Sequence, residues 1–341
     1  MKTRSLWSII VLFALWGCAT PQESPSTPTP DYADWEGVYF GTHAAGVDME
    51  QALGHKFAIQ LYYHKWGNSF KGGPFEPNAQ NGWITLSTWE YAPGFGGVDD
   101  PYLLQPLKAV VDGEKDDYLR AFAQDAASFG KPLFLRWGHE MNGDWYLWSG
   151  SKNGGATTNQ YGDLQKPDGP ELFVDAYRHI YDVFAQENAQ NVIWVWCPNV
   201  VMEGPLGEPW NDIENYYPGD VYVDWLCMDG YNWGSSQSWS SWQTFDEVFA
   251  PTYARLQQIN TDKPIMIGEF ASTELGGDKP AWVLDSFQTL LADYAQIRAV
   301  VWFNLNKETD WRMNSSPEVL EAFQQVLSLP GWVQTYPGFE K

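Results

Sequence analysis

Residues 133–148 read Leu-Phe-Leu-Arg-Trp-Gly-His-Glu-Met-Asn-Gly-Asp-Trp-Tyr-Leu-Trp. The segment begins as an apolar strand, and a His-Glu pair and a cluster of aromatic residues follow directly. Enzymes built on parallel barrels place their acids at the ends of strands, and Glu140 lies at such a position. A structural alternative is open, in which a buried Glu140 pairs with Arg136. The other strand ends of the chain decide between the two.

Short apolar strands alternate with helical patterns on both sides of this stretch, which indicates a parallel α/β fold. We expect eight strands, at residues 37–42, 56–63, 83–89, 132–137, 191–196, 223–228, 264–268 and 297–303. Helices are expected at residues 47–53, 78–81, 115–129, 170–186, 245–259 and 281–294. These repeated units fit a (β/α)8 TIM barrel better than an open sheet. No linker interrupts residues 35–341, so we expect one catalytic domain there.

A barrel enzyme should carry its polar and reactive residues just after the carboxyl ends of the strands. The sequence has this pattern after each of the eight strands. In chain order, these residues are His43, His64 to Trp66, Trp89 to Tyr91, His139-Glu140, Asn199, Asp229 to Trp233, Glu269, and Asn304 to Trp311.

Glu140 and Glu269 follow the fourth and seventh strands, whose ends face each other across the mouth of a closed barrel. Two carboxylates about 5–5.5 Å apart would suit a double displacement on a glycosidic bond, in which one protonates the leaving oxygen and the other attacks the anomeric carbon. A wider gap would indicate inversion. The acid needs a high pKa and the nucleophile a low one, so we expect different surroundings for the two side chains.

The string Arg136-x-x-His-Glu-Met-Asn-Gly-x-Trp-Tyr146, with the later Ile267-Gly-Glu-Phe270, resembles glycoside hydrolase family 26, whose members are retaining barrel enzymes. The resemblance covers residues 35–330. It implies that Glu140 is the acid/base, that Glu269 is the nucleophile and that His139 lies beside them in the sugar site. It further implies that Tyr231 holds the nucleophile and that Trp302 is the platform beneath the sugar at the cleavage site.

Further candidates come from the residues themselves. The period of two in a strand places Arg136, Gly138 and Glu140 on one face and His139 on the other, although a loop at the strand end could turn His139 inward. For Arg136 a core-sealing ion pair is the alternative. Glu90, Asn199 and His43 follow strands and suit sugar hydroxyls, or else cap loops. The aromatic candidates for stacking on sugar rings, each of which could instead be buried, are Trp66, Trp145, Trp148, Trp233 and Trp311.

The composition favours a neutral partner. The 341 residues carry a formal charge of −23, which argues against nucleic acid and polyanionic polysaccharides. The 20 Trp, 18 Tyr and 18 Phe offer flat faces that suit sugar rings as well as a core. No Gly-x-Gly-x-x-Gly motif or phosphate loop is present, and no Cys or His set has metal-ligand spacing, so we expect neither a cofactor nor a metal. We expect a monomer.

The first residues have the pattern of an export signal. Lys2 and Arg4 precede an apolar run over residues 6–15 and then Gly17-Cys18, so residues 1–17 are predicted to be a signal peptide. The end of this segment resembles a bacterial lipobox, which implies lipidation of Cys18, and residues 18–34 would be a Pro/Ser/Thr-rich tether. We therefore expect an exported lipoprotein held at the cell envelope, at the outer membrane or cell surface, by its lipid alone. Simple secretion is the alternative.

Cys197 and Cys227 fall in neighbouring predicted strands, where they form either a disulfide, as an exported protein allows, or two free thiols.

For the substrate, residues 302–312 and the string Arg136-Trp-Gly-His-Glu140 look more similar to the glucan-active branch of the family than to the mannanases. This resemblance implies mixed-linkage β-1,3-1,4-glucan, with β-1,4-mannan and β-1,3-xylan as alternatives. A catalytically inactive surface glycan-binding lipoprotein would lack a carboxylate, and both are present. An amidase or esterase would need an activated Ser or Cys with a His partner, for which no pattern exists.

Overall fold

The computed structural model describes residues 37–90, 106–201 and 204–335. The predicted signal peptide, Cys18 and the tether lie outside the described residues.

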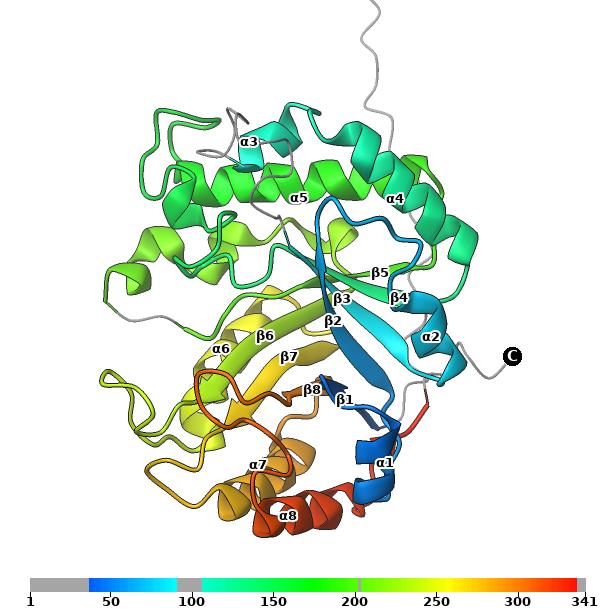
Figure 1. Ribbon diagram of the computed structural model, residues 1–341. Coiled ribbons are helices and arrows are strands. Elements are labelled where there is room, and N and C mark those ends of the chain that lie inside the picture. The colour runs from blue at the N-terminus through cyan, green and yellow to red at the C-terminus, as the bar shows by residue number, and fades with distance from the viewer. Residues whose placement is uncertain (1–36, 91–105, 202–203, 336–341) are drawn as a thin grey trace, which may run out of the picture.

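The centre of the molecule is a closed parallel barrel (Figure 1). Its eight strands are β1 (Val38–His43), β2 (Ile59–Lys65), β3 (Ile84–Glu90), β4 (Leu133–Trp137), β5 (Val192–Trp196), β6 (Trp225–Asn232), β7 (Ile265–Ser272) and β8 (Ile297–Phe303). Each strand pairs with the next, and β1 pairs with both β2 and β8, which closes the barrel. The predicted (β/α)8 TIM barrel is therefore confirmed. A two-residue strand, β9 (Trp332–Val333), which the sequence pattern did not predict, pairs with the first residues of β1.

Helices surround the barrel on the outside, with α3, α4 and α5 on one side of the strands and α6, α7 and α8 on the other in Figure 1. The helices are α1 (Val47–Leu53), α2 (Phe75–Gln80), α3 (Pro106–Val111), α4 (Asp116–Phe129), α5 (Asp168–Gln186), α6 (Phe245–Ile259), α7 (Lys279–Asp293) and α8 (Pro317–Leu327). Between β5 and β6 the chain forms short 3-10 turns instead of a long helix. Thr244 begins α6 with a capping box to Glu247, which fixes where the preceding loop ends.

Two of the strands run four residues beyond their predicted ends. β6 and β7 stay paired as far as Asn232 and Ser272, with an irregularity after Met228. Asp229, Tyr231 and Glu269 therefore lie within strands instead of after them, which corrects the prediction. Strand pairing holds these side chains more rigidly than a loop would.

The core has two layers because both faces of most strands are buried; β2, which exposes Tyr62 and Lys65, is the exception. The barrel interior is filled by side chains such as Leu61, Phe134 and Val301. The alternate side chains, including Trp302 of β8, pack outward against the helices. This alternation decides which residues of a strand can reach the mouth of the barrel.

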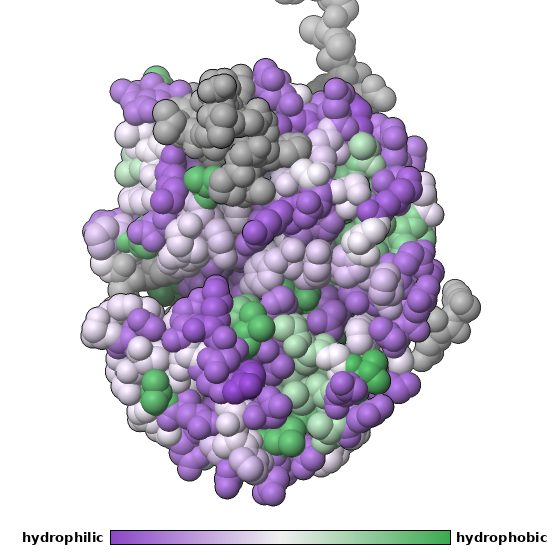
Figure 2. Space-filling view, in the orientation of Figure 1, coloured by the Kyte–Doolittle hydropathy of each residue, from purple (hydrophilic) through white to green (hydrophobic). Residues whose placement is uncertain are grey.

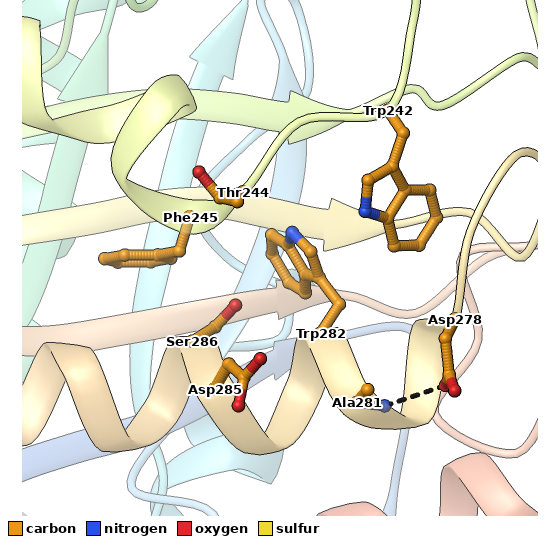
Figure 3. A pocket seen from close by; sticks show the side chains of 8 residues that line it. All are labelled: Trp242, Thr244, Phe245, Asp278, Ala281, Trp282, Asp285 and Ser286. Atoms are coloured by element: carbon orange, nitrogen blue, oxygen red, sulfur yellow. Dashed lines mark hydrogen bonds between the residues drawn. The ribbon is translucent and has the colours of Figure 1, made fainter.

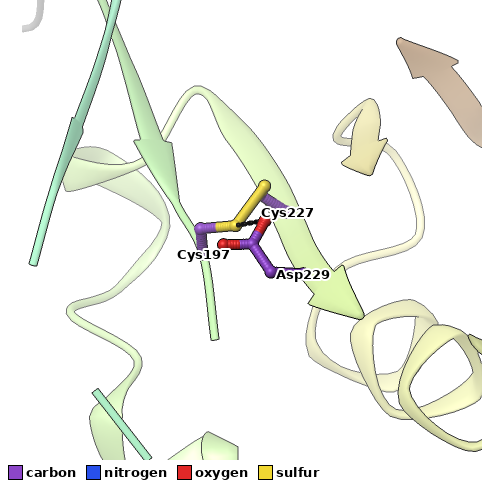
Figure 4. A group of neighbouring side chains, drawn as sticks. All are labelled: Cys197, Cys227 and Asp229. Carbon is purple, nitrogen blue, oxygen red and sulfur yellow. Dashed lines mark hydrogen bonds between the residues drawn. A yellow bond between two sulfur atoms is a disulfide. The ribbon is translucent and has the colours of Figure 1, made fainter. Parts of the chain in front are cut away.

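Cys197 and Cys227 form a disulfide inside the barrel (Figure 4). It links the segment directly after β5 to β6, and it lies beside the carboxylate of Asp229, whose Oδ1 is 3.2 Å from Cys197 Sγ. Of the two possibilities that the sequence left open, the structure therefore has the disulfide.

The visible face of the molecule is largely hydrophilic, with small separate apolar patches (Figure 2). Within the described residues, no helix combines the length and apolar character that a membrane span needs.

Candidate active site

Arg136 of β4 lies at the centre of a buried polar cluster. Its guanidinium is wholly buried and donates to both oxygens of Asp229 at 2.7 Å, to the hydroxyl of Thr88, and to Oε1 of Glu269. Burial alone would lower the pKa of Arg136, but the charges of Asp229 and Glu269 raise it, so the guanidinium stays charged. One cation thus serves two buried carboxylates, as such groups require in a low-dielectric site.

Glu269 of β7 is held in its ionised form. Its Oε2 accepts a hydrogen bond of 2.6 Å from the hydroxyl of Tyr231, while Oε1 binds Arg136. Burial on its own would raise the pKa of Glu269, but the charge of Arg136 and the hydroxyls of Tyr231 and Tyr63 lower it to about 2. The carboxylate is therefore charged at neutral pH and points into the mouth of the barrel.

Glu140 has a different environment. Its Oε2 accepts from the indole N–H of Trp145 at 2.7 Å, and its Oε1 accepts from the side-chain amide of Asn199 at 2.6 Å. Both partners are neutral. Burial and the nearby charge of Glu269 raise the pKa of Glu140 to about 7. Near neutrality the carboxyl group can therefore give up or take up a proton.

The backbone turns sharply between β4 and Glu140. β4 ends at Trp137, Gly138 has φ +63°, and Glu140 itself has φ +54°. A side chain at Gly138 would meet Phe173 at 2.8 Å. A non-glycine residue in this conformation costs about 1–3 kcal/mol, a strain found mostly at functional sites. Strand alternation therefore does not extend to residues 138–140, which corrects the face assignment made from the sequence.

His139 is buried beside the same cluster. Its Nε2 lies 3.0 Å from the hydroxyl of Tyr146, and its carbonyl accepts from the indole N–H of Trp148 at 2.6 Å. Burial and the charge of Arg136 lower the pKa of His139 to about 3, so the ring is neutral. The turn after β4 thus brings His139 to the site from which strict alternation would have excluded it.

A pair of asparagines fixes the donor to Glu140. The side chain of Asn142 accepts from the backbone N–H of Asn199 at 2.8 Å and donates to its carbonyl at 2.9 Å. The Asn142 carbonyl in turn accepts from Asn211 at 2.7 Å. Asn142 was in the quoted motif but was not singled out, because its role passes through the backbone of another residue.

A group of aromatic rings in mutual contact lies beside Glu269, which Tyr231 binds. The ring of Phe303 stacks on His43 with 5.2 Å between centroids, and it makes edge contacts with Tyr231 at 5.8 Å and Tyr63 at 6.5 Å. The sequence reasoning found His43 and Tyr231 but missed Tyr63 and Phe303. Both side chains lie on the inward side of their strands, β2 and β8, but the apolar sequence of β8 does not show which of its sides that is.

Trp302, by contrast, is not at the site, and the expectation that it forms a platform beneath the sugar is wrong. Its ring is fully buried between β8 and the helices, against Phe270, Trp282 and Phe323. Its indole N–H donates to the carbonyl of Trp311 at 2.7 Å. β8 presents Phe303 to the mouth instead, one residue further along the strand.

The other tryptophans divide between core and surface. Trp66 is buried against Trp89, Trp148 is buried behind His139, and Trp311 is buried against Tyr231, so none of these offers an open face. Trp145 is 47% exposed, although its N–H binds Glu140. Of the stacking candidates named from the sequence, only Trp145 and the half-buried Trp233 remain accessible.

Glu90 is half-buried at the end of β3. Burial and the charge of Glu269 raise its pKa. The side chain is thus within the electrostatic field of the cluster, in keeping with a place at the rim of the barrel mouth.

The cluster contains side chains at the spacing of metal ligands, together with the Arg136 guanidinium. Ligand atoms of His139, Asp229 and Glu269 lie within 4.8 Å of one another, which is a spacing that metal sites share. Arg136 binds both carboxylates, however, and so supplies the positive charge between them.

A separate hollow of about 160 Å³ lies outside the barrel wall, between the first turns of α6 and α7 (Figure 3). Trp242 and Trp282 border it, and Asp278 caps α7 there by accepting from the N–H of Ala281 at 2.9 Å. None of the carboxylates of the central cluster lines this hollow.

A parallel barrel with one ionised and one protonatable carboxyl group in its mouth has the architecture of the barrel glycoside hydrolases. The sequence profile of glycosyl hydrolase family 26 matches residues 105–270. Endoglucanase H of Acetivibrio thermocellus is 36% identical over 338 residues, which cover 96% of this chain. The chain belongs to glycosyl hydrolase family 26.

A mannan endo-1,4-beta-mannosidase of Caldalkalibacillus mannanilyticus is 26% identical over 166 residues, or 45% of this chain. The chain spans about a third of the length of these two curated relatives, 34% and 29% respectively. The solved structure of GH26C from Muricauda sp. has the same fold, with a TM-score of 0.63 over 90% of both chains at 15% identity.

Proposed function

We propose that the protein is a retaining endo-β-glycosidase that cleaves a neutral β-linked polysaccharide, with Glu140 as acid/base and Glu269 as nucleophile. The observation that carries this proposal is the contrast in pKa between two buried carboxyl groups, about 7 for Glu140 and about 2 for Glu269. Between these values the first is protonated and the second is charged, which are the states that the first step of a double displacement requires.

In the first step, a carboxylate oxygen of Glu269 attacks the anomeric carbon while the proton of Glu140 passes to the departing glycosidic oxygen. The products are a glycosyl ester of Glu269 and a free sugar hydroxyl. Burial and the charge of Glu269 both raise the pKa of Glu140 in the free enzyme, and because the ester has no negative charge, the second of these influences is removed. Glu140 is then a carboxylate that takes a proton from water, whose oxygen attacks the anomeric carbon and releases Glu269.

The neighbouring residues have supporting roles in this scheme. Tyr231 and Arg136 orient the nucleophile, and Asn199 and Trp145 orient the acid. The exposed face of Trp145, next to Glu140, suits stacking on the sugar that leaves. The neutral His139, the half-buried His43 and Glu90 at the rim suit contacts with sugar hydroxyls.

Mixed-linkage β-1,3-1,4-glucan is the first choice of substrate. The 36% identity to a protein named an endoglucanase supports it, and so does the sequence after the eighth strand. The relative named a mannan endo-1,4-beta-mannosidase supports β-1,4-mannan as the alternative, and β-1,3-xylan is the third.

The test is hydrolysis of a panel of lichenan, barley glucan, glucomannan, galactomannan and β-1,3-xylan, with product sizes measured. We expect the highest kcat/KM on lichenan or barley glucan. Proton NMR of the first product should detect the β-anomer before mutarotation. Glu269→Ala, purified in parallel, is the control for a contaminating hydrolase. An α-anomer as first product, or no activity on any polymer, would reject the proposal.

We also propose that the chain is exported and anchored through a lipid on Cys18, on the basis of residues 1–18. Cys18→Ala should move the protein from the membrane fraction to the soluble fraction of the producing cells. An unchanged distribution would contradict the anchor.

A further inference from the structure

The loop between β6 and α6, residues 233–244, differs in composition from the rest of the chain. It reads Trp-Gly-Ser-Ser-Gln-Ser-Trp-Ser-Ser-Trp-Gln-Thr and contains no charged residue, in a chain whose net charge is −23. Three of its twelve residues are tryptophan. The ring of Trp239 is 70% exposed, although most large apolar side chains of this protein are buried.

The loop is braced by hydrogen bonds at both ends. Oδ1 of Asn232 accepts from the backbone N–H groups of Gly234 at 3.2 Å and Gln243 at 3.0 Å, so one side chain ties the start of the loop to its end. Ser240 Oγ donates to the Gly234 carbonyl at 2.7 Å across the middle. Ser235 N–H donates to the Leu275 carbonyl of the next loop at 2.9 Å. Trp239 therefore extends from an ordered support.

Trp242 anchors the far end of the same loop. Its indole lies against Gly277, where a Cβ atom would come within 2.2 Å of the ring, so this close approach depends on glycine. It also borders the hollow beside α7 in Figure 3. Trp242 therefore holds the loop against the barrel, while Trp239 faces solvent.

A continuous file of aromatic rings joins Trp239 to the nucleophile. The centroids of Trp239 and Trp233 are 5.4 Å apart, and those of Trp233 and Tyr231 are 5.8 Å apart. The hydroxyl of Tyr231 binds Glu269. The buried ring of Trp311 packs against this row of rings, with its centroid 4.9 Å from that of Trp233. The exposed ring is thus connected by ring contacts to the place where the bond would be cleaved.

We infer that Trp239 is the platform of a distal sugar-binding subsite, on which a pyranose ring of the polymer stacks at some distance from the scissile bond. The inference rests on the proposed function and adds to it a preference for long chains over short ones. An uncharged, hydroxyl-rich loop with an exposed indole has the chemistry that recognises a neutral sugar. Because hydrogen bonds already hold the loop in place, binding a sugar loses less conformational entropy of the loop.

The test compares a polymer with a short substrate. The variants are Trp239→Ala, Trp239→Phe and, as a control, Val221→Ala, which truncates a 74% exposed side chain before β6 at the other end of that strand. KM is measured on lichenan and on 4-nitrophenyl β-cellobioside, and products of a long oligosaccharide are sized. If the substrate panel selects mannan, glucomannan and the β-mannobioside replace these two.

Trp239→Ala should raise KM on the polymer about 3- to 10-fold, in line with aromatic contacts worth about 0.5–1.5 kcal/mol. It should shift the cleavage positions in the long oligosaccharide and leave the short substrate unchanged. Trp239→Phe should restore most of the affinity, and Val221→Ala should behave as wild type.

Equal KM values for Trp239→Ala and wild type on the polymer would overturn the inference while leaving the proposed function intact. The same loss on both substrates would also overturn it, because it would show a structural role for the ring. If Trp239 instead mediates self-association, sedimentation would show a dimer that Trp239→Ala dissociates with no change in KM, which again rejects the subsite. A wild-type protein that cleaves no polymer of the substrate panel would reject the proposed function itself.

Discussion

Glu140 and Glu269 carry the same side chain and are almost equally buried, at 7% and 4% exposed, yet their surroundings shift their pKa values in opposite directions. Desolvation acts on both and favours the neutral form. At Glu269 the hydrogen-bonded guanidinium of Arg136 lowers the pKa by more than burial raises it. Glu140 has only neutral donors and the repulsion of its counterpart. Burial alone therefore does not assign acid and nucleophile; the position of one cation does.

The largest expected effect is the loss of activity when either carboxyl group is removed, and it should differ between the two because their chemical roles differ. Glu269→Ala should abolish hydrolysis of every substrate, because no other group can form the glycosyl ester. Glu140→Ala should lower activity on polymer by about 10²–10⁴-fold, the usual contribution of a general acid. It should lower the rate of glycosyl transfer from 2,4-dinitrophenyl glycosides far less, because that leaving group needs no proton.

Pre-steady-state and steady-state kinetics on both substrate types would measure this contrast. Glu76→Ala, which removes an exposed carboxylate on α2, is the matched control and should change neither rate. If both active-site variants lose the two activities equally, the division of roles is wrong.

The next largest effect is expected on the free energy of unfolding when Arg136 is replaced. Arg136→Met leaves Asp229 and Glu269 buried without a positive partner, and loss of one member of a buried ion pair costs about 3–5 kcal/mol. Arg255 also binds two carboxylates, Asp212 and Glu214, but near the surface. Arg255→Met should therefore cost about 1 kcal/mol or less.

Urea unfolding at pH 7 measures both free energies of unfolding. Equal losses for Arg136→Met and Arg255→Met would mean that burial does not amplify the role of Arg136, and the comparison between the two carboxyl groups would lose its basis.

A smaller effect is expected for the hydroxyl that binds Glu269. Tyr231→Phe removes a 2.6 Å hydrogen bond to a charged oxygen and should lower kcat/KM about 10- to 100-fold, since such bonds contribute about 1.5–3 kcal/mol. The pKa of Glu269 should rise, which moves the acidic limb of the pH profile to higher pH. Tyr217→Phe removes a like bond to Asp220 at the surface and is the control, with no expected change. A profile that does not move would contradict the role of Tyr231.

The smallest expected effect is on the basic limb of the pH–activity profile, where Glu140 loses its proton. Activity should fall as pH rises through about 7, where Glu140 loses its proton. The amide of Asn199 donates to the ionised form and lowers this pKa, so Asn199→Ala should move the limb to higher pH. Asn215→Ala, at an exposed position that does not contact Glu140, should leave it in place. A shift to lower pH would show that the hydrogen bond stabilises the protonated form instead.

The barrel was predictable from the sequence because each strand is a short apolar run that ends in polar residues. The extensions of β6 and β7 were not, since Asp229 to Asn232 and Glu269 to Ser272 contain little apolar periodicity and pair only in the folded sheet. Trp302 was misplaced for a related reason. Both faces of β8 are buried, so the run Val300-Val-Trp-Phe303 gives no sign of which residue faces inward.

As the strand-end pattern led us to expect, the two carboxyl groups lie near each other. Arg136 and Tyr231 bind Glu269, Asn199 binds Glu140, and the charge of Glu269 is close enough to raise the pKa of Glu140. The role of Asn142 could not be predicted from the sequence, because its side chain binds the backbone of Asn199, 57 positions away. The family resemblance implied the direction of the pKa contrast, high for Glu140 and low for Glu269, but its physical cause needed the position of the guanidinium.

Barrel closure has a consequence for how the chain acquires its fold. β1 pairs with β8, and the hydroxyl of Thr42 donates to the Trp302 carbonyl at 3.2 Å across 260 positions of sequence. During synthesis, the first strand therefore has only β2 as a partner until residue 303 has emerged. Contacts between such distant positions slow folding. A chain cut before residue 297 would expose two open sheet edges, one on β1 and one on β7, and should aggregate instead of forming a smaller stable barrel.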